Sequence, residues 1–390
     1  MVFGELFKFS DTAKLLVLLA FKKNTTTFRW WFVFMDIEKR MELIESTGEE
    51  TVMREELRIL LETKTRPVAY DGFEPSGQLH IAQGIMRAIN TNKMIEAGVH
   101  FKFWVADWFG WMNNKMGGDL EKIKQVGEYQ IEVWKSCGMD VKNVEFLWAS
   151  DAMADREYWK RTVNIARNNT VQRIVRCSQI MGRTEKDTLT AAQIFYPCMQ
   201  ASDIFHLKAD ITNLGMDQRK VNVLAREIGP KLGFWKPVMV SVHMLMGLNK
   251  PPEGITDQVE RAIAMKMSKS IPDSAVFMTD SEEEVKRKIT KAYCPATTED
   301  NPMMEYMKYI IFRSFDSVTI ERSSKFGGDA TYYNFDELKK DFTSGKLHPA
   351  DLKNSTAKYI NELLEPVRKH FSKGKPKELA DLIRSQGVTR

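Results

Sequence analysis

Short apolar runs alternate with amphipathic stretches along most of the chain after Pro67. Each run is short and bounded by turn residues, which favours buried strands over helices. The stretches between them carry apolar residues near helical spacing, and two of them end in a glycine suited to a helix C-cap, Gly98 and Gly138. The strands are predicted at residues 68–73, 101–109, 144–148 and 209–215, and the helices at residues 81–98, 120–138, 191–207 and 218–229.

Strands that alternate with helices predict an α/β fold, here a Rossmann-like doubly wound parallel sheet. We assign this domain to residues 61–279. Residues 280–390 are charge-dense without a convincing buried parallel strand, which predicts an α-helical C-terminal domain. Residues 1–60 are expected to form an N-terminal extension, of which 1–34 suit a presequence or a disordered segment. The turn-rich, charged residues 249–266 are expected to form a surface loop or excursion.

The composition narrows the classes of protein to which the chain can belong. A net charge of +5 permits a polyanionic partner but lacks the excess of a histone-like binder. No apolar run approaches the roughly 20 residues of a membrane-spanning helix, so no membrane partner is expected. The four cysteines are scattered, without the close pairs of zinc sites or redox motifs, so we expect reduced thiols in a cytoplasmic protein.

The stretch "AYDGFEPSGQLHIAQG", residues 69–84, leads from a predicted strand through a glycine-containing turn into a helix. Turns of this kind hold phosphates, because free N–H groups and the positive end of the helix face the ligand. Gly72 and Gly77 leave room for a nucleotide, while Ser76 and His80 can contact its phosphates. A purely structural turn is an equally common alternative, since the stretch matches neither a P-loop nor a GxGxxG motif.

A second candidate, "KMSKS", places two lysines and two serines in residues 266–270, directly after the turn-rich excursion. A mobile loop with this composition can clamp a triphosphate, and Lys266 and Lys269 can neutralise charge that develops on a departing pyrophosphate. The alternative is an ordinary basic loop, which the coincidence with the His80 turn disfavours.

Three polar residues share one face of an otherwise apolar predicted helix. Tyr196, Gln200 and Asp203 stand at positions i, i+4 and i+7. Gln218 follows a predicted strand, and Tyr70 ends the first one, so both can converge on the same crevice at the carboxyl edge of the sheet. The group is either a pocket for a polar ligand or a set of separate, internally satisfied core contacts.

"HIAQ", residues 80–83, resembles the HIGH motif of class I aminoacyl-tRNA synthetases, and "KMSKS" matches their second motif in every letter. With "YPCMQASDI", "GMDQRKVNVLARE", "TKAYCP" and "HPADLK", the chain resembles the tyrosyl-tRNA synthetases of the archaeal and eukaryotic cytosolic type over about residues 60–372. Ala82 and Gln83 depart from the motif, and the missing second histidine removes one possible phosphate contact.

The resemblance implies an enzyme that activates tyrosine with ATP and transfers it to the 3′ end of its tRNA. It also implies Mg²⁺ carried by the nucleotide phosphates, no dedicated metal ligands, and a homodimer. The tyrosine site would be Tyr70 and Asp203 at the hydroxyl, Tyr196, Gln200 and Gln218 around the amino group, and Glu74 nearby. ATP would be bound by Gly72, Ser76, Gly77, His80, Gln83, Lys266, Met267, Ser268, Lys269 and Ser270, with His80, Lys266 and Lys269 catalytic, and the anticodon by Phe326, His348 and Asp351.

Two alternatives stay open at this point. A tryptophanyl-tRNA synthetase would share the fold and both motifs, so the Tyr70 and Asp203 pair is what favours tyrosine. A non-catalytic, synthetase-like RNA-binding protein would be expected to have lost some of the motif lysines and pocket residues, all of which are present.

Overall fold

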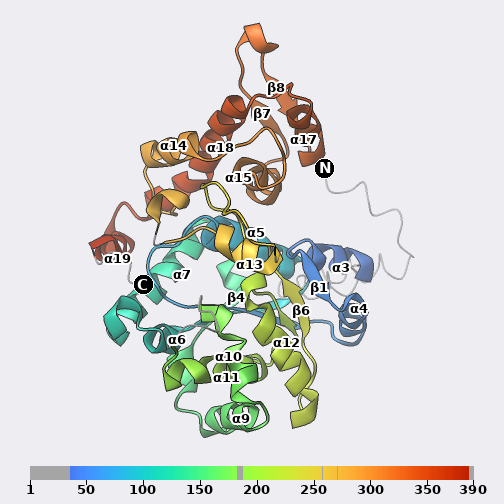
Figure 1. The fold of residues 1–390 in the computed structure, drawn as a ribbon, viewed down its shortest axis with the longest axis vertical. Helices are drawn as coiled ribbons and strands as arrows, with labels where there is room; N and C mark the ends of the chain where they lie inside the picture. Colours follow the sequence, from blue (N-terminus) through green and yellow to red (C-terminus); the bar gives the residue numbers. More distant parts are fainter. Residues whose placement is uncertain (1–35, 182–187, 257, 270, 386–390) are drawn as a thin grey trace, which may run out of the picture.

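A six-stranded sheet forms the centre of the computed structural model, which describes residues 36–181, 188–256, 258–269 and 271–385 (Figure 1). The strand order is β1-β6-β5-β2-β3-β4. All neighbouring strands run parallel except β1, which pairs antiparallel with β6. The strands are β1 (Glu50–Val52), β2 (Val68–Phe73), β3 (His100–Val105), β4 (Val144–Trp148), β5 (Ile211–Thr212) and β6 (Val238–Ser241).

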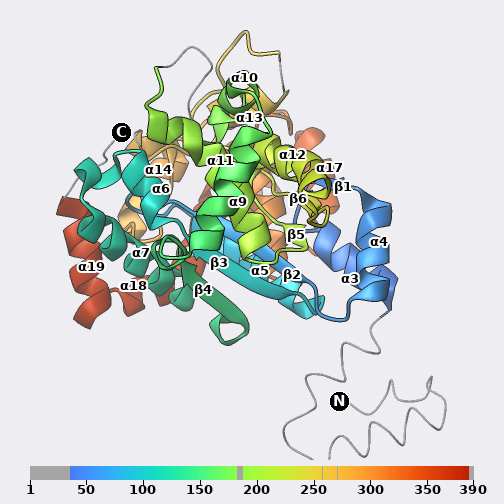
Figure 2. The ribbon, with the colours of Figure 1, turned by 90° about the horizontal axis from the view of Figure 1, so that it is seen from below.

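Helices connect the parallel strands and cover both faces of the sheet (Figure 2). The longest are α7, α9 and α11, each begun by a side-chain N-cap that satisfies a free backbone N–H: Asp119, Asp155 and Thr190. The helices and single turns of this unit are α3 (Ile37–Glu45), α4 (Arg54–Thr63), η2 (Ala82–Met86), α5 (Arg87–Glu96), α6 (Asp107–Met112), η3 (Lys115–Gly118), α7 (Leu120–Ser136), η4 (Val141–Asn143), α8 (Ala149–Ala152), α9 (Arg156–Arg167), α10 (Val171–Val175), η5 (Ser178–Met181), α11 (Ala191–His206), η6 (Met216–Gln218), α12 (Arg219–Ile228), η7 (Pro230–Leu232), α13 (Gln258–Met265) and η8 (Pro272–Ser274).

Side chains of the central strands alternate between two hydrophobic clusters, as the two-residue period of a strand requires. Ala69, Phe101 and Phe103 belong to the cluster on the side of α5 and α7. Tyr70 and Trp104 belong to the other cluster, which α6, α9, α11 and α12 complete. Tyr70 therefore points toward α11, which carries the polar face predicted from the sequence.

Residues 36–63, expected as part of an N-terminal extension, supply α3, β1 and α4 to this unit. Strand β1 forms the antiparallel edge of the sheet, with Glu50 opposite Ser241. Leu57 of α4 is fully buried, and Glu56 forms an ion pair with the buried Arg226 of α12. These residues are therefore packed into the sheet unit. Residues 1–34 lie outside the described part of the chain.

The C-terminal unit is mostly helical, with one two-stranded antiparallel hairpin, β7-β8, at its far end (Figure 1). Its last helix, α19, returns to pack beside α7 of the sheet unit, where Lys375 pairs with Glu128. The elements are α14 (Glu282–Lys291), α15 (Pro302–Tyr306), η9 (Met307–Ile311), α16 (Phe312–Ser314), β7 (Val318–Ile320), η10 (Ser324–Phe326), β8 (Ala330–Tyr332), α17 (Phe335–Thr343), α18 (Pro349–His370) and α19 (Gly374–Ser385).

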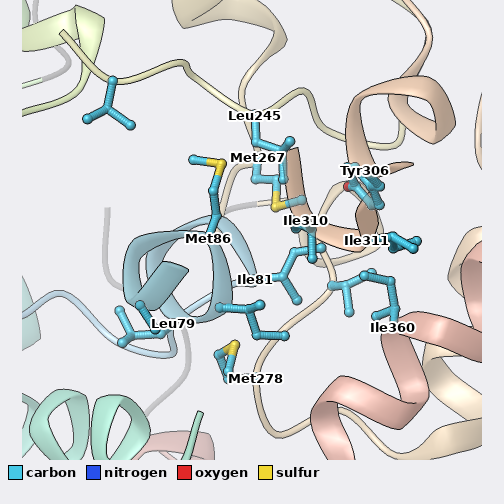
Figure 3. Close-up of a cluster of buried hydrophobic side chains, with 14 of the residues drawn as sticks. Leu79, Ile81, Met86, Leu245, Met267, Met278, Tyr306, Ile310, Ile311 and Ile360 are labelled. Carbon is cyan, nitrogen blue, oxygen red and sulfur yellow. The ribbon is translucent and has the colours of Figure 1, made fainter. Parts of the chain in front are cut away.

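One hydrophobic cluster crosses from the sheet unit into the C-terminal unit (Figure 3). Ile81, beside η2, packs in it with Met278 and with Ile310 and Ile311 of η9. Met267, in the middle of the "KMSKS" sequence, belongs to the same cluster and is only 3% exposed. The two units therefore share a core at the place where both sequence motifs lie.

Three predicted elements differ from the structure. The strand predicted over residues 209–215 is reduced to the two residues of β5, Ile211–Thr212. The run 101–109 is not one strand: β3 ends at Val105, and Asp107 begins α6, where its carboxylate accepts hydrogen bonds from the N–H groups of Trp108 (2.9 Å) and Ser150 (3.0 Å). The segment 249–266 is not only loop, because α13 occupies its second half. Its eight residues contain neither proline nor glycine, so nothing in them prevents a helix.

Replacing Leu57 by alanine should lower the free energy of unfolding by about 2–5 kcal/mol, because the change leaves a cavity between α4 and the sheet. Urea unfolding measures this change in the free energy of unfolding. The matched control is Ile59→Ala on the same helix, which is 57% exposed and should change stability by less than about 0.5 kcal/mol. Equal effects of the two changes would show that α4 is not part of the folded core.

Candidate active site

A cavity of about 380 Å³ opens at the carboxyl edge of the parallel strands, where open α/β sheets bind their ligands. The structure brings most of the residues predicted from the sequence to this one place. Gly77 does not line it; its φ of +119° explains the glycine by backbone geometry. Ser270 lies outside the described residues. Those that line the cavity are Tyr70, Gly72, Glu74, Ser76, His80, Gln83, Tyr196, Gln200, Asp203, Gln218, Lys266, Met267, Ser268 and Lys269.

Backbone hydrogen bonds join the turn that carries His80 to the chain just beyond the "KMSKS" sequence. The N–H of Ile81 donates to the carbonyl of Val276 (3.0 Å), and the N–H of Met278 donates to the carbonyl of Leu79 (2.8 Å). These bonds, together with the apolar cluster around Met267, hold the chain after residue 269 against the turn that carries His80 (Figure 3). The lysines of the second motif are thereby brought to the histidine of the first.

Lys269 and His80 lie together in this end of the cavity. The Lys269 ammonium donates to Oγ of Ser76 at 3.1 Å. Burial lowers the pKa of Lys269 to about 8, with Lys115 and Lys266 adding to the effect and Glu74 opposing it. Burial, and to a smaller extent the positive charges of Lys269 and Lys266, lowers the pKa of His80 well below its ordinary value. The imidazole is therefore neutral. Its Nδ1 is buried without a hydrogen-bond partner among the described residues.

Lys266 is held differently, by an ion pair with Asp217 whose Nζ–Oδ2 distance is 3.0 Å. Asp217 lines the cavity from η6, next to Gln218. Two lysines, a neutral histidine and a serine hydroxyl thus surround one end of the cavity, and this arrangement suits a polyanionic ligand.

The opposite end of the cavity is formed by Tyr70 and Asp203. The hydroxyl of Tyr70 is buried and has no hydrogen-bond partner within the described part of the chain. Asp203 is 1% exposed, and its Oδ1 accepts a hydrogen bond from the hydroxyl of Tyr158 at 2.7 Å. Burial raises the pKa of Asp203 to about 8, although the Tyr158 hydrogen bond opposes the rise. Buried polar groups without protein partners indicate a polar ligand.

Between the two ends lie a carboxylate and a pair of amides. Glu74 accepts hydrogen bonds from Asn113 (2.6 Å) and from the hydroxyl of Tyr196 (3.3 Å). The side-chain amide of Gln200 donates to that of Gln218 at 3.0 Å. Burial raises the pKa of Glu74, while Lys115 acts against it. This middle region offers acceptor oxygens to a cationic group.

Sequence reasoning placed Tyr70 at the end of its strand and Gln218 at the end of another. Tyr70 is instead the third residue of β2, and Gln218 lies in η6, six residues beyond β5. Both side chains still line the cavity. The alternation of side chains along β2 directs Tyr70 toward α11. Gln218 lines it from η6, the turn that directly precedes α12.

Several residues at the site escaped the sequence analysis. Two of them, Asp71 and Arg87, form an ion pair (2.7 Å), and both side chains are less than 7% exposed. Arg87 also donates to the side chain of Asn213 (2.9 Å), and this network holds the start of α5 to the sheet beneath the cavity. Nothing in the sequence signals this pair, because Arg87 lies inside the helix predicted over residues 81–98 and its partner on β2 cannot be inferred from spacing. The others are Asn113, Lys115, Tyr158, Asp217 and His243.

The structure describes no cluster of three or more His, Cys, Asp or Glu side chains that could hold a metal ion in residues 36–181, 188–256, 258–269 and 271–385. The predicted anticodon residues lie far from the cavity, in the C-terminal unit. Phe326 belongs to η10, and its side chain lies outside the described part. His348 caps α18, and Asp351 lies in the first turn of that helix. Arg322 donates to the carbonyls of Gly328 and Lys346, both at 2.9 Å, and so holds the η10 turn beside the start of α18.

No helix in the described part of the chain is both long enough and apolar enough to cross a bilayer. Residues 62–365 match the family model of the class I tRNA synthetases (W and Y). A curated relative, tyrosine–tRNA ligase 1, cytoplasmic, of Arabidopsis thaliana, is 51% identical over 360 residues, which are 91% of this chain and 90% of the relative.

Solved structures give the same picture. The tyrosyl-tRNA synthetase of Pyrococcus horikoshii in complex with L-tyrosine aligns with a TM-score of 0.84 and 41% identity, over 90% of this chain and all of that one. The tyrosyl-tRNA synthetase of Leishmania major in complex with tyrosinol aligns with a TM-score of 0.82 and 45% identity, over 90% of this chain and 61% of that one.

Replacing Tyr158 by phenylalanine should raise the pKa of Asp203 above about 8, because the carboxylate loses a donor while it stays buried. Carbon-13 NMR of carboxyl-labelled aspartate follows this titration, and Asp203→Asn assigns the signal. Tyr129→Phe, at a buried tyrosine that does not line the cavity, is the control and should leave the titration unchanged. An unchanged pKa in Tyr158→Phe would show that this hydrogen bond does not set the charge of Asp203.

Proposed function

The chain belongs to the W and Y family of class I tRNA synthetases, and we propose that its activity as a tyrosine–tRNA ligase is carried by the cavity described above. The enzyme activates tyrosine with ATP and transfers the tyrosyl group to tRNA. One observation supports the assignment of the cavity most strongly. A buried, unpartnered tyrosine hydroxyl and a buried carboxyl stand at one end, and the two motif lysines and the motif histidine stand at the other.

The Tyr70 and Asp203 end recognises the phenol of the substrate. The substrate hydroxyl exchanges hydrogen bonds with the Asp203 carboxyl and the Tyr70 hydroxyl, and Tyr158 keeps that carboxyl in place. Phenylalanine in the same position would leave the buried Tyr70 hydroxyl unpaired and Asp203 with only its hydrogen bond from Tyr158. A buried polar group left unpaired costs roughly 1–3 kcal/mol. Tyrosyl-tRNA synthetases are the standard example of such discrimination between tyrosine and phenylalanine.

The middle of the cavity binds the α-amino group, through Tyr196 and the coupled amides of Gln200 and Gln218, with Glu74 adding negative charge. This places the tyrosine carboxylate toward His80 and the lysines. A carboxylate oxygen then attacks the α-phosphorus of ATP, the bond from that phosphorus to the bridging oxygen of the β-phosphate breaks, and pyrophosphate leaves. No protein nucleophile takes part, so the contribution of the protein is position and charge.

Lys266 and Lys269 stabilise the negative charge that develops on the departing pyrophosphate, and Ser76 and Gly72 border the nucleotide. The neutral His80 approaches the phosphates without adding to the positive charge already there. Magnesium bound to the triphosphate would supply further charge neutralisation. Binding of the ion through the nucleotide, rather than through protein ligands, fits the side chains present. The carboxylates of Asp71 and Asp217 are already paired with Arg87 and Lys266.

In the second step the terminal ribose hydroxyl of the tRNA attacks the carbonyl of tyrosyl-adenylate, and AMP leaves. The C-terminal unit reads the anticodon, with Phe326 as a stacking platform and His348 and Asp351 at the edge of the base. The link that Arg322 makes between the η10 turn and the segment before α18 supports this placement, since it brings the three positions to one end of the unit.

We further propose a cytoplasmic homodimer. Exposed apolar side chains occur on α6, α9, α10 and α11, which pack on one another in the lower part of Figure 1. Burial of such a group between two subunits is more favourable than its exposure to water. The side chains are Trp111, Val163, Val171 and Phe195.

Replacing Tyr70 by phenylalanine should lower kcat/KM for tyrosine about 10- to 100-fold in tyrosine-dependent ATP–pyrophosphate exchange, because one hydrogen bond to the substrate hydroxyl is lost. The value for phenylalanine should change much less, so discrimination between the two amino acids shrinks. Exchange assays with tyrosine, phenylalanine and tryptophan measure this, with Tyr129→Phe as the buried-tyrosine control. Unchanged discrimination in Tyr70→Phe would contradict the assignment of the hydroxyl end.

Activity should also decline at high pH because of Lys269. Since burial lowers its pKa to about 8, the ammonium is charged below that pH and loses its proton as the pH rises through it. At saturating tyrosine, kcat/KM for ATP should therefore fall above about pH 8, by up to about tenfold per pH unit. Lys269→Arg, which keeps its charge, should move this decline to higher pH even if the rate is lower. The control is Lys160→Arg, at an exposed ion pair, which should leave the pH profile unchanged. If the alkaline decline stayed at the same pH in Lys269→Arg, Lys269 would be excluded as its source.

A further inference from the structure

Residues 242–247, which directly follow β6, make backbone contacts with Lys266 and with Met216, the residue before its ion-pair partner Asp217. We call them the 242–247 segment. The N–H of Met216 donates to the carbonyl of Val242 at 3.0 Å, which fixes the turn that carries Asp217. At the other end of the segment, Met246 forms an antiparallel bridge with Lys266. The position of this short segment therefore determines where both charged residues stand.

Close packing makes the second of these contacts tight. The N–H of Gly247 donates to the carbonyl of Met265 at 2.8 Å. A Cβ atom at Gly247 would lie 3.0 Å from the carbonyl oxygen of Ser274 and 3.4 Å from that of Lys266. A shift of the 242–247 segment must therefore move the backbone of Lys266 as well.

His243 is the second residue of this segment and lines the cavity. Its Nδ1 is 2.7 Å from Oε2 of Glu49, just before β1, and its Nε2 is 3.1 Å from Oε2 of Glu305 on α15. The ring also stacks on Tyr309 of η9, with ring centroids 4.1 Å apart and planes 15° apart. One imidazole thus joins the sheet edge, the rim of the cavity and the C-terminal unit.

Glu305 carries the effect of His243 to the rest of the segment. The same Oε2 that faces the imidazole accepts the backbone N–H of Met246 at 2.7 Å. The neighbouring Tyr306 donates its hydroxyl to the carbonyl of Met246 at 3.2 Å. Both backbone groups of Met246 are thus held by α15, and the charge on His243 keeps Glu305 in position to hold one of them.

The charges around the ring favour its protonated form. Burial alone would lower the pKa of His243, but the carboxylates of Glu305 and Glu49 outweigh burial and raise it to about 9. Two cations are also near the ring on which His243 stacks: Lys308 and Arg313 lie 4.8 and 5.2 Å from the centre of the Tyr309 ring. At neutral pH the imidazolium therefore holds two carboxylates from different parts of the chain.

We propose that His243 is a positioning residue for amino-acid activation: its imidazolium, bound by Glu49 and Glu305, fixes the 242–247 segment and thereby sets the place of Lys266 against the triphosphate. The inference rests on the role of Lys266 given under the proposed function. His243 acts through Lys266 and needs no contact of its own with the reacting atoms. A displacement of a charged group by about 1 Å can cost on the order of 100-fold in rate.

A double-mutant cycle of His243→Gln and Lys266→Ala, measured by tyrosine-dependent ATP–pyrophosphate exchange, tests this. Alone, His243→Gln should lower kcat about 10- to 100-fold, while the Kd for tyrosine, measured by equilibrium dialysis without ATP, changes less than about twofold. In the Lys266→Ala background the same change should have little further effect, because two residues that act as one unit are not additive. His243→Lys, which keeps a positive charge beside the carboxylates, should recover part of the rate.

The matched control is His370→Gln, which removes another histidine that joins the C-terminal unit to the sheet unit, through Glu132 at 2.8 Å. It lies outside the cavity and should leave kcat unchanged. Additive losses in the cycle, an unchanged kcat in His243→Gln, or equal losses of tyrosine binding and rate would overturn the role of His243 while leaving that of Lys266 intact. A silent Lys266→Ala would instead overturn the proposed function of that lysine, and the inference with it.

Discussion

The backbone pairing between residues 79–81 and 276–278 is the contact on which the active site depends. Two hydrogen bonds join the turn that carries His80 to the chain just beyond the "KMSKS" sequence, which lies almost 200 residues further along. On one side of this pairing, Met267 and Ile81 belong to a buried hydrophobic cluster (Figure 3). On the other side Lys269 meets Ser76, so the same contact that buries apolar surface also assembles the phosphate end of the cavity.

Burial then gives the two ends of the cavity different chemistry. At the phenol end it leaves the Tyr70 hydroxyl without a partner and raises the pKa of Asp203, so a ligand hydroxyl replaces missing contacts. At the phosphate end it lowers the pKa values of His80 and Lys269, so His80 is neutral while Lys269 keeps its charge below about pH 8. The same physical effect therefore prepares one end for a neutral hydroxyl and the other for a triphosphate.

The sequence predicted the parts of this enzyme that follow from local pattern. Strands β2 and β4 and helix α11 matched closely, because each is a short apolar run or a periodic stretch bounded by clear turn or cap residues. The polar face of α11 was also correct, since helical spacing alone places Tyr196, Gln200 and Asp203 together. The strand predicted over 101–109 was wrong, because a buried aspartate at 107 can begin a helix inside an aromatic run.

What the sequence could not supply were contacts between distant segments. Tyr158 is 45 residues from Asp203, and no spacing rule connects them. His243 is close in space to Glu49 and Glu305 only because the sheet edge and α15 meet at the end of β6. The individual roles of the site residues, the domain boundaries and the dimer stay predictions, since they depend on ligands and on a second chain.

The most direct test of the account is a crystal structure of the enzyme with a non-hydrolysable sulfamoyl analogue of tyrosyl-adenylate. We expect the phenol oxygen within about 2.6–3.2 Å of both the Tyr70 hydroxyl and an Asp203 carboxyl oxygen, with the sulfamoyl group near His80 and Lys269. A phenol ring bound away from these two side chains, or an adenosine outside the cavity at the carboxyl edge of the sheet, would contradict it.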